Sequence, residues 1–335
     1  MPTYILKRTI YSIPLLISVS IVAFVLITAP PGDYMSELKN QLVRRSGLTR
    51  TEATEIAQQM RERYGLDQPI YGQYWSWISG IITRGDFGYS FYYRKPVSEI
   101  IWKRLGWTFA IALTALVFSY VGGMIPGIYS ATHQYRASDH LFTVVAFLGL
   151  SIPNFFFALV ILYILNFQLG ISIVGGLFSP QFMTASWSWA KFIDLLKHLW
   201  IPVIVVGTAG TAGTAGTMRV MRNNLLDIIG MSYIQTARSK GLRETVVVYK
   251  HAVRNALQPI IMSMGMRMPR LITGSAVVAI VLNLPTTGPV LLNAVMSQDM
   301  YLAGSFILMI AFTLVIGNLL ADIALGVLDP RIRYE

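Results

Sequence analysis

Three charged residues lie in apolar segments where ionic side chains are costly. Arg267 and Arg270 are the only charged residues of segment 259–284, and Asp322 is the only one of segment 301–328. A charge near the centre of a membrane-spanning helix costs at least about 2.5–3.5 kcal/mol, so such residues usually face a bundle interior or a wet cavity. Guanidinium groups bind anionic or hydroxyl-rich molecules through several donors. The pattern fits two roles equally well: lining a pathway or gate, or charge pairing that only stabilises a helix bundle.

The spacing of the two arginines limits where they can lie. Residues three apart share one face of a helix. Counted from Pro259, Arg267 and Arg270 are roughly 12–17 Å along a helix that rises about 1.5 Å per residue. This depth is far from the end of the segment. Asp322, near the end of the last apolar segment, is a candidate partner of Arg267.

The sequence offers little for catalysis. It contains no G-x-x-x-x-G-K-[ST] phosphate-binding loop, and no Ser/His/Asp or Cys/His set is indicated by spacing. There are no cysteines, and the four histidines (His133, His140, His198, His251) lack the spacing of a metal site. We therefore expect no catalytic, cofactor or metal site. If ATP drives this protein, a separate chain must hydrolyse it.

The elements that would position these residues are membrane-spanning helices. The chain has 335 residues, 54% hydrophobic and 13% charged, whereas a soluble domain has about 25% charged residues. A spanning helix needs about 20 mostly apolar residues. Six segments qualify: 10–29, 107–132, one helix within 141–190, 199–217, 259–284 and 301–328. The first is too long for a signal-peptide core and is interpreted as a retained anchor. We predict an all-α integral membrane protein with six transmembrane helices.

The distribution of Lys and Arg predicts the orientation. The N-terminus carries Lys7 and Arg8, the C-terminal tail carries Arg331 and Arg333, and segment 218–258 holds seven Lys or Arg against two acidic residues. Positive residues favour the cytoplasmic side, so both termini and this segment are predicted to be cytoplasmic. Segment 30–106 has eleven Lys or Arg, but it is too long for its charge to decide. The net charge of +11 then needs no nucleic-acid partner.

Segment 30–106 is predicted to be a small extracytoplasmic domain. Thr49 and Glu52 fit a capping box, and the helix that follows should run to about Tyr64 and end at Gly65. A linker would not expose Trp75, Trp77 and several tyrosines to water. The expected organisation is 1–29, cytoplasmic N-terminus and first helix; 30–106, outer domain; 107–328, five-helix core including a loop at 218–258; and 329–335, cytoplasmic tail.

Residues 233–259 form a basic, polar segment with helix-forming character, interrupted once by Gly241. This pattern predicts two short helices that meet at a glycine, with Pro259 ending the second. The segment resembles the EAA loop of ABC-importer permeases, which has an alanine-rich triplet, a glycine four residues later and an apolar-proline ending. The counterparts are Gln235-Thr236-Ala237, Gly241 and Leu257-Gln258-Pro259. The resemblance implies that residues 232–240 form a coupling helix seated on an ATPase. An amphipathic helix on anionic lipid is the alternative.

The resemblance extends over essentially the whole chain. APPGD (29–33), GLDQP (65–69), GDFGYS (85–90), PVSEII (96–101) and LDPRIR (328–333) occur in the order found in inner-membrane permeases of dipeptide/oligopeptide-type ABC importers, a group that also includes oligosaccharide and nickel transporters. Two features depart from the general pattern. Gln235 replaces the glutamate of the triplet, and residues 284–289 lack the usual aromatic-Pro-Gly-x-Gly form.

The resemblance implies a type I importer permease fold and residence in a bacterial or archaeal inner membrane. It also implies four kinds of partner: a second homologous permease in a heterodimer, two ABC ATPases, an extracytoplasmic substrate-binding protein and membrane lipid. It assigns ATPase coupling to Tyr233, Gln235, Thr236, Ala237, Lys240 and Gly241. The expected function is to form half of the pathway for oligopeptides or oligosaccharides, which the external protein selects.

Two other classes of function are the alternatives. An ion-coupled secondary transporter would call for a charge in a broken helix near the midplane or for inverted repeats. The sequence shows no symmetry between its halves, and Asp322 alone is weak support. A purely structural anchor would not explain the 233–259 segment. Residues 207–217, GTAGTAGTAGT, favour a tightly packed interior helix, with a helix that glides against a partner as the alternative.

Overall fold

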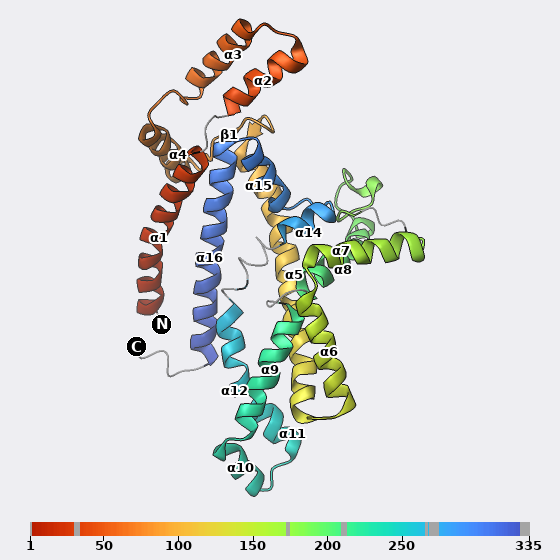
Figure 1. Ribbon diagram of the computed structural model, residues 1–335. Helices are drawn as coiled ribbons and strands as arrows, with labels where there is room; N and C mark the ends of the chain where they lie inside the picture. Colours follow the sequence, from red (N-terminus) through yellow and green to blue (C-terminus); the bar gives the residue numbers. More distant parts are fainter. Residues whose placement is uncertain are drawn as a thin grey trace. The chain divides into compact units, whose positions relative to one another are not determined.

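The computed structural model describes residues 2–29, 34–171, 175–208, 213–264, 267 and 275–328. These residues are mostly helical and divide into two compact units. The N-terminal unit contains Lys7–Gly106 and Thr286–Thr313, and the central unit contains Met1–Leu6, Trp107–Pro285 and Leu314–Glu335. Figure 1 labels their elements. Three helices therefore contribute to both units.

The N-terminal unit combines long apolar helices with an insertion, the segment 34–96 between α1 and α5. Its elements are α1 (Pro2–Thr28), α2 (Tyr34–Ser46), α3 (Arg50–Arg63), α4 (Ile70–Arg84), β1 (Tyr89–Ser90), β2 (Lys95–Pro96), the start of α5 (Val97–Thr132), α15 (Thr287–Met296) and the first half of α16 (Met300–Leu328). The two strands pair antiparallel, with Tyr89 opposite Pro96 and Ser90 opposite Lys95.

The predicted capping box is present at the start of α3. The Thr49 hydroxyl accepts from the Glu52 N–H, and the Glu52 carboxylate accepts from the Thr49 N–H. The helix ends at Arg63, Tyr64 caps it and Gly65 has φ +66°. Met35, Ala57 and Phe91 form a buried cluster beneath partly buried tyrosines. The insertion is thus folded, as its aromatic content predicts.

Asp299 ties the β1 turn to the start of α16. Its carboxylate accepts from the Ser90 hydroxyl at 2.6 Å, from the Tyr92 N–H at 3.1 Å and from the Leu302 N–H at 3.3 Å. The last bond makes Asp299 an N-cap, a position that favours an acidic side chain. Burial raises the pKa of Asp299, and the hydrogen bonds oppose this rise. A residue distant in sequence therefore fixes this turn.

The central unit contains the beginning of α1, the second part of α16 and the other helices that the structure describes. These other helices are the rest of α5, then α6 (Ala137–Ser151), α7 (Asn154–Tyr163), α8 (Trp189–Thr208), α9 (Thr214–Ile229), α10 (Ser232–Ser239), α11 (Glu244–Val246), α12 (Val253–Ala256) and α14 (Ala276–Val281). Short π-helical turns, η1 (Ile164–Gln168) and η3 (Val247–Ala252), and a 3₁₀ turn, η2 (Pro180–Phe182), complete it. Residues 258–264 are also helical.

Close packing of α5 against α9 depends on glycine. A Cβ on Gly123 would lie 2.6 Å from the Thr214 carbonyl oxygen, and one on Gly127 would lie 2.8 Å from the Met218 carbonyl oxygen. The Ser119 hydroxyl donates to the Gly207 carbonyl at 2.6 Å. Small residues allow such close approach between helices in lipid. Gly207, at the end of α8, and residues 214–217, at the start of α9, are closely packed, and residues 209–212 between them lie outside the described part.

Three described helices are long and apolar enough to cross a membrane: Thr9–Thr28, Val97–Thr132 and Met300–Leu319. A fourth is obtained if Ala137–Ser151 and Asn154–Gln168, which meet at a bend of 105°, are one span. Pro153 explains the break, because the residue before a proline is driven out of the helical region, and Ile152 has ψ 123°. The segment predicted at 259–284 lies partly outside the described residues.

The segment predicted at 199–217 differs from the helices observed. One helix, α8, already begins at Trp189 and ends at Thr208, and α9 begins at Thr214. The predicted segment began at residue 199, after the true start of this helix, because the prediction counted only residues without charge. Asp194 is satisfied by the N–H and hydroxyl of Ser179, and Lys191 donates to the Ala185 carbonyl and lies over the rings of Phe178 and Trp187. These contacts allow charged residues in the first turns of the helix.

Candidate functional site

Residues 230–257 form a compact helical tip that follows α9 (Figure 1). In α10, Ile234 and Ala237 are buried and lie three residues apart, so they share one face of the helix. Val247, Val248 and Ala252 of η3 are also buried, and η3 packs against α9 and α10. The alternation of these apolar residues with polar ones folds the segment onto itself and leaves one face exposed.

The turn after α10 depends on Gly241. Its φ is +74°, in the region that glycine enters without a Cβ penalty. Its N–H donates to the Arg238 carbonyl at 2.9 Å. A Cβ added to Gly241 would have no described atom within 4 Å, so a side chain at 241 would meet backbone strain but no steric clash within this chain.

Two polar contacts fix the tip. Arg238 donates from Nε and Nη2 to the two carboxylate oxygens of Glu244, at 3.1 and 2.6 Å. This hydrogen bonding holds the pKa of Glu244 below its ordinary value. The Asn255 amide donates to the Tyr233 hydroxyl at 2.7 Å. The first contact bridges the turn at Gly241, and the second ties α10 to α12.

Five of the six predicted coupling residues are exposed: Tyr233, Gln235, Thr236, Lys240 and Gly241. Ala237 is buried and supports the helix from beneath. The same tip exposes four large apolar side chains that the sequence reasoning missed: Met231, Leu242, Val246 and Tyr249. A mixed basic and apolar surface of this kind suits either protein docking or contact with anionic lipid. The predicted helix at 232–240 is confirmed as Ser232–Ser239, capped by Lys240.

The prediction that Pro259 ends the second helix is wrong in position, because the helix ends three residues earlier. α12 ends at Ala256, Leu257 lies in a turn, and helical structure resumes at 258–264. Pro259 lies in the first turn of this following helix, where its missing N–H is tolerated.

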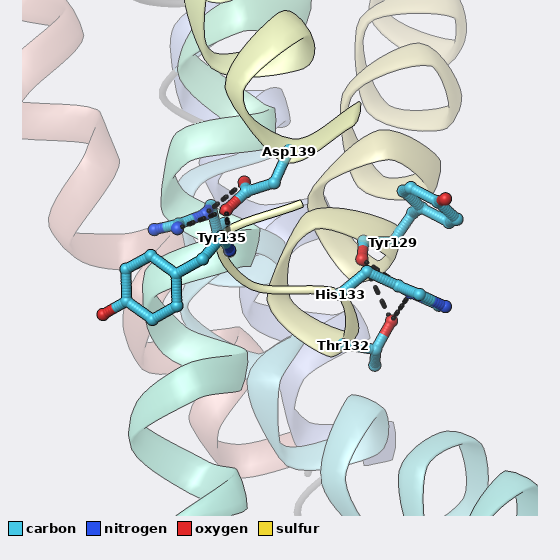
Figure 2. Close-up of polar contacts among 6 residues, drawn as sticks. Tyr129, Thr132, His133, Tyr135 and Asp139 are labelled. Carbon is cyan, nitrogen blue, oxygen red and sulfur yellow. Dashed lines mark hydrogen bonds and ion pairs between the residues drawn. The ribbon is translucent and has the colours of Figure 1, made fainter. Parts of the chain in front are cut away.

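An ion pair joins the start of α6 to α9. The Asp139 carboxylate is buried and accepts two hydrogen bonds from Arg222, Nε to Oδ1 at 3.1 Å and Nη2 to Oδ2 at 3.0 Å. The Tyr135 N–H donates to the same carboxylate at 3.1 Å (Figure 2). On the adjacent end of α5, the His133 ring stacks on Tyr129 (Figure 2). No sequence signal connects Asp139 with Arg222, which is 83 residues away.

Arg267 is held among residues of α5 and α9. Its Nη1 donates to the Thr217 hydroxyl at 2.7 Å, and its guanidinium lies 5.1 Å from the centre of the Tyr120 ring. Both of these partners are buried. Arg270 lies outside the described residues, and the side chain of Asp322 in α16 is not among those described. Within the described part of the chain, no group of three or more His, Asp or Glu residues could hold a metal ion.

Comparison with known proteins covers the whole chain. Residues 123–334 match the family described as binding-protein-dependent transport system inner membrane component, and residues 1–112 match the N-terminal region of such membrane components. The chain is 34% identical over 337 residues to the oligopeptide transport system permease protein AppB of Bacillus subtilis, with full coverage of both. It is 31% identical over 336 residues to the glutathione transport system permease protein GsiC of Escherichia coli, again with full coverage.

Proposed function

Because this chain belongs to the inner-membrane permease subunits of peptide-type ABC importers, we propose that it forms half of a translocation pathway whose opening is driven by ATPases docked on its helical tip. The observation that carries this proposal is the exposed face of α10, with Tyr233, Gln235, Thr236 and Lys240, on a tip whose helices pack together through buried apolar side chains. A rigid tip can transmit a displacement to α9.

Short peptides are the proposed substrate class. Two relatives that align over the whole chain are named as permeases for oligopeptides and for glutathione, and both of these substrates are peptides. Oligosaccharides are the alternative. An extracytoplasmic binding protein would deliver the substrate, a second homologous permease would complete the pathway, and two ATPase subunits would hydrolyse ATP.

The proposed topology has six spans and both termini in the cytoplasm, with an extracytoplasmic domain at 30–106. The excess of Lys and Arg in segment 218–258 supports this orientation. Reporter fusions at Gly65 and Arg243 should label opposite sides of the membrane. Labelling on the same side would contradict the topology.

Arg267, Arg270 and Asp322 remain the proposed pathway or gate residues. The contact of Arg267 with Thr217, near the start of α9, supports a connection between this site and the tip, because α9 leads directly to α10. A guanidinium there could bind a peptide carboxylate through more than one donor.

Substitution of Gly241 tests whether this turn carries the coupling. Gly241→Val should strain the positive-φ turn, which costs about 1–2 kcal/mol for an ordinary residue. It also adds a branched side chain to the docking face. We expect ATP hydrolysis by the reconstituted complex to continue while peptide uptake falls.

Two matched variants make the result specific. Gly241→Asn should preserve more uptake, since asparagine tolerates positive φ. Gly230→Ala should behave as the unmodified protein, because Gly230 has φ −75° and a Cβ there lies 3.5 Å from its nearest neighbour. Full uptake by Gly241→Val in an assembled complex would refute the proposed coupling role.

A further inference from the structure

We propose that α4 lies in the membrane interface, with Tyr71, Trp75 and Ile82 in contact with lipid at the C-terminal end of the α1 span. α4 belongs wholly to the N-terminal unit, and its contact with lipid is independent of the coupling role proposed for the tip.

One face of α4 is packed on the end of α1. The Tyr74 hydroxyl lies 2.8 Å from the Ser20 hydroxyl oxygen, and the Trp77 ring stacks on Phe24 with centroids 5.5 Å apart. Ser20 and Phe24 belong to the apolar span Thr9–Thr28. Since Thr28 ends this helix, the contacts place α4 alongside its last two to three turns, about 6–12 Å from its end at 1.5 Å per residue.

The start of α16 supports the same face of α4. Trp77 is buried with Phe24 and Met300 in one cluster, and Ile78 and Ile81 pack against it. A Cβ on Gly304 would meet the Trp77 ring at 3.4 Å. α4 therefore lies against the ends of two apolar helices that qualify as membrane spans.

A second apolar stripe of α4 has no cover within the described part of the chain. Tyr71, Trp75 and Ile82 are 78%, 71% and 76% exposed. At about 100° per residue these three positions fall within about 40° of one another around the helix. Ser76 and Thr83 lie on a different side and are polar. The apolar arc of α4 is thus wider than the face that the protein buries.

Lipid is the occupant that fits this stripe. The last turns of α1, on which α4 packs, also expose apolar side chains: Val22, Val25 and Leu26. Residues 70–83 contain no charged side chain, and Arg84 and Asp86 follow at the end. Trp and Tyr concentrate at membrane interfaces, and an interfacial helix buries its apolar face about 5–10 Å into the boundary between headgroups and acyl chains. The contacts of α4 with α1, about 6–12 Å from the end of that helix, overlap this range.

The chain has no native cysteine, so a single introduced cysteine can be labelled selectively. Trp75→Cys and Ile82→Cys, each carrying an environment-sensitive fluorophore, are measured in the assembled complex reconstituted into phosphatidylethanolamine–phosphatidylglycerol vesicles. We expect a blue-shifted emission that is quenched more strongly by nitroxide-labelled lipid than by aqueous iodide. Both replaced side chains are exposed, so folding should be preserved.

Three controls calibrate the measurement. Val25→Cys on the exposed side of α1 reports lipid contact, Gln59→Cys on exposed α3 reports water, and Thr83→Cys reports the polar side of α4. The emission and quenching of the labels at 75 and 82 should resemble those of the label at 25. The label at 83 should behave more like the label at 59. If labels at 75 and 82 are quenched by iodide as strongly as that at 59, the stripe faces water and the inference is wrong. If neither quencher reaches them, another protein covers the stripe, which also overturns it.

Discussion

Neutralising the buried carboxylate of the Asp139–Arg222 pair should destabilise the contact between α6 and α9. The Asp139 side chain is 3% exposed and that of Arg222 is 25% exposed, so Asp139→Asn would leave a largely desolvated guanidinium without its counter-charge. Breaking a buried pair in this way costs about 3–5 kcal/mol. Arg222 retains partial access to solvent, so we expect the lower limit, about 3 kcal/mol, or roughly 100-fold in the folding equilibrium.

The comparison of single and double variants separates the pair from its surroundings. Arg222→Gln should cost more than Asp139→Asn, because it leaves the more deeply buried charge unpaired. The Asp139→Asn/Arg222→Gln double variant should cost less than the sum of the two single changes, since neither charge then remains alone. Equilibrium unfolding in mixed micelles, followed by tryptophan fluorescence, measures each free energy.

An exposed ion pair in the same chain is the matched control. Lys103 lies 2.6 Å from Glu99, but the two side chains are 68% and 41% exposed, and exposed pairs contribute little. Glu99→Gln should leave the unfolding free energy unchanged. The reasoning is refuted if Asp139→Asn resembles Glu99→Gln, or if the two changes at 139 and 222 are simply additive.

Three further predictions concern packing, the proposed pathway and pH. Gly123→Ala should destabilise the protein by about 1–3 kcal/mol through a clash with α9. Gly106→Ala is the control: a Cβ at Gly106 would meet no neighbouring described residue within 4 Å, so this change should be neutral or stabilising by up to about 1 kcal/mol. Thermal unfolding of the two variants measures both effects. Arg267→Gln should lower peptide uptake in vesicles while the complex still assembles by size-exclusion chromatography; loss of assembly would show that the residue is structural. Burial raises the pKa of Asp299 in the folded state. The contribution of this carboxyl group to the free energy of unfolding is therefore full below the pKa that it has in the unfolded chain, and it is lost as the pH rises through the pKa that it has in the folded protein. Asp299→Asn should therefore gain stability relative to the unmodified protein between acidic and neutral pH, and parallel pH profiles of the two unfolding midpoints would contradict this.

Local patterns were enough to predict several elements. The uncharged runs predicted the apolar helices at Thr9–Thr28 and Met300–Leu319 and the apolar part of α5. The Thr49 capping box and the positive φ of Gly241 also follow from residues only a few positions apart. Such features are determined by the sequence alone, because hydrophobic periodicity, capping and glycine conformation depend on near neighbours in the chain. The motif order likewise identified the permease family.

Other features were decided by tertiary packing. The approach of α6 to α9 brings Asp139 to Arg222, and the turn at β1 meets Asp299, 209 residues from Ser90. Packing of α10 buries Ala237 of the predicted coupling set and leaves Leu242, Val246 and Tyr249 exposed. Charged residues near the start of α8 are accommodated by contacts with Ser179 and Phe178. These pairs form because distant helices pack in one arrangement, and no local pattern specifies which buried charge or exposed side chain will meet which partner.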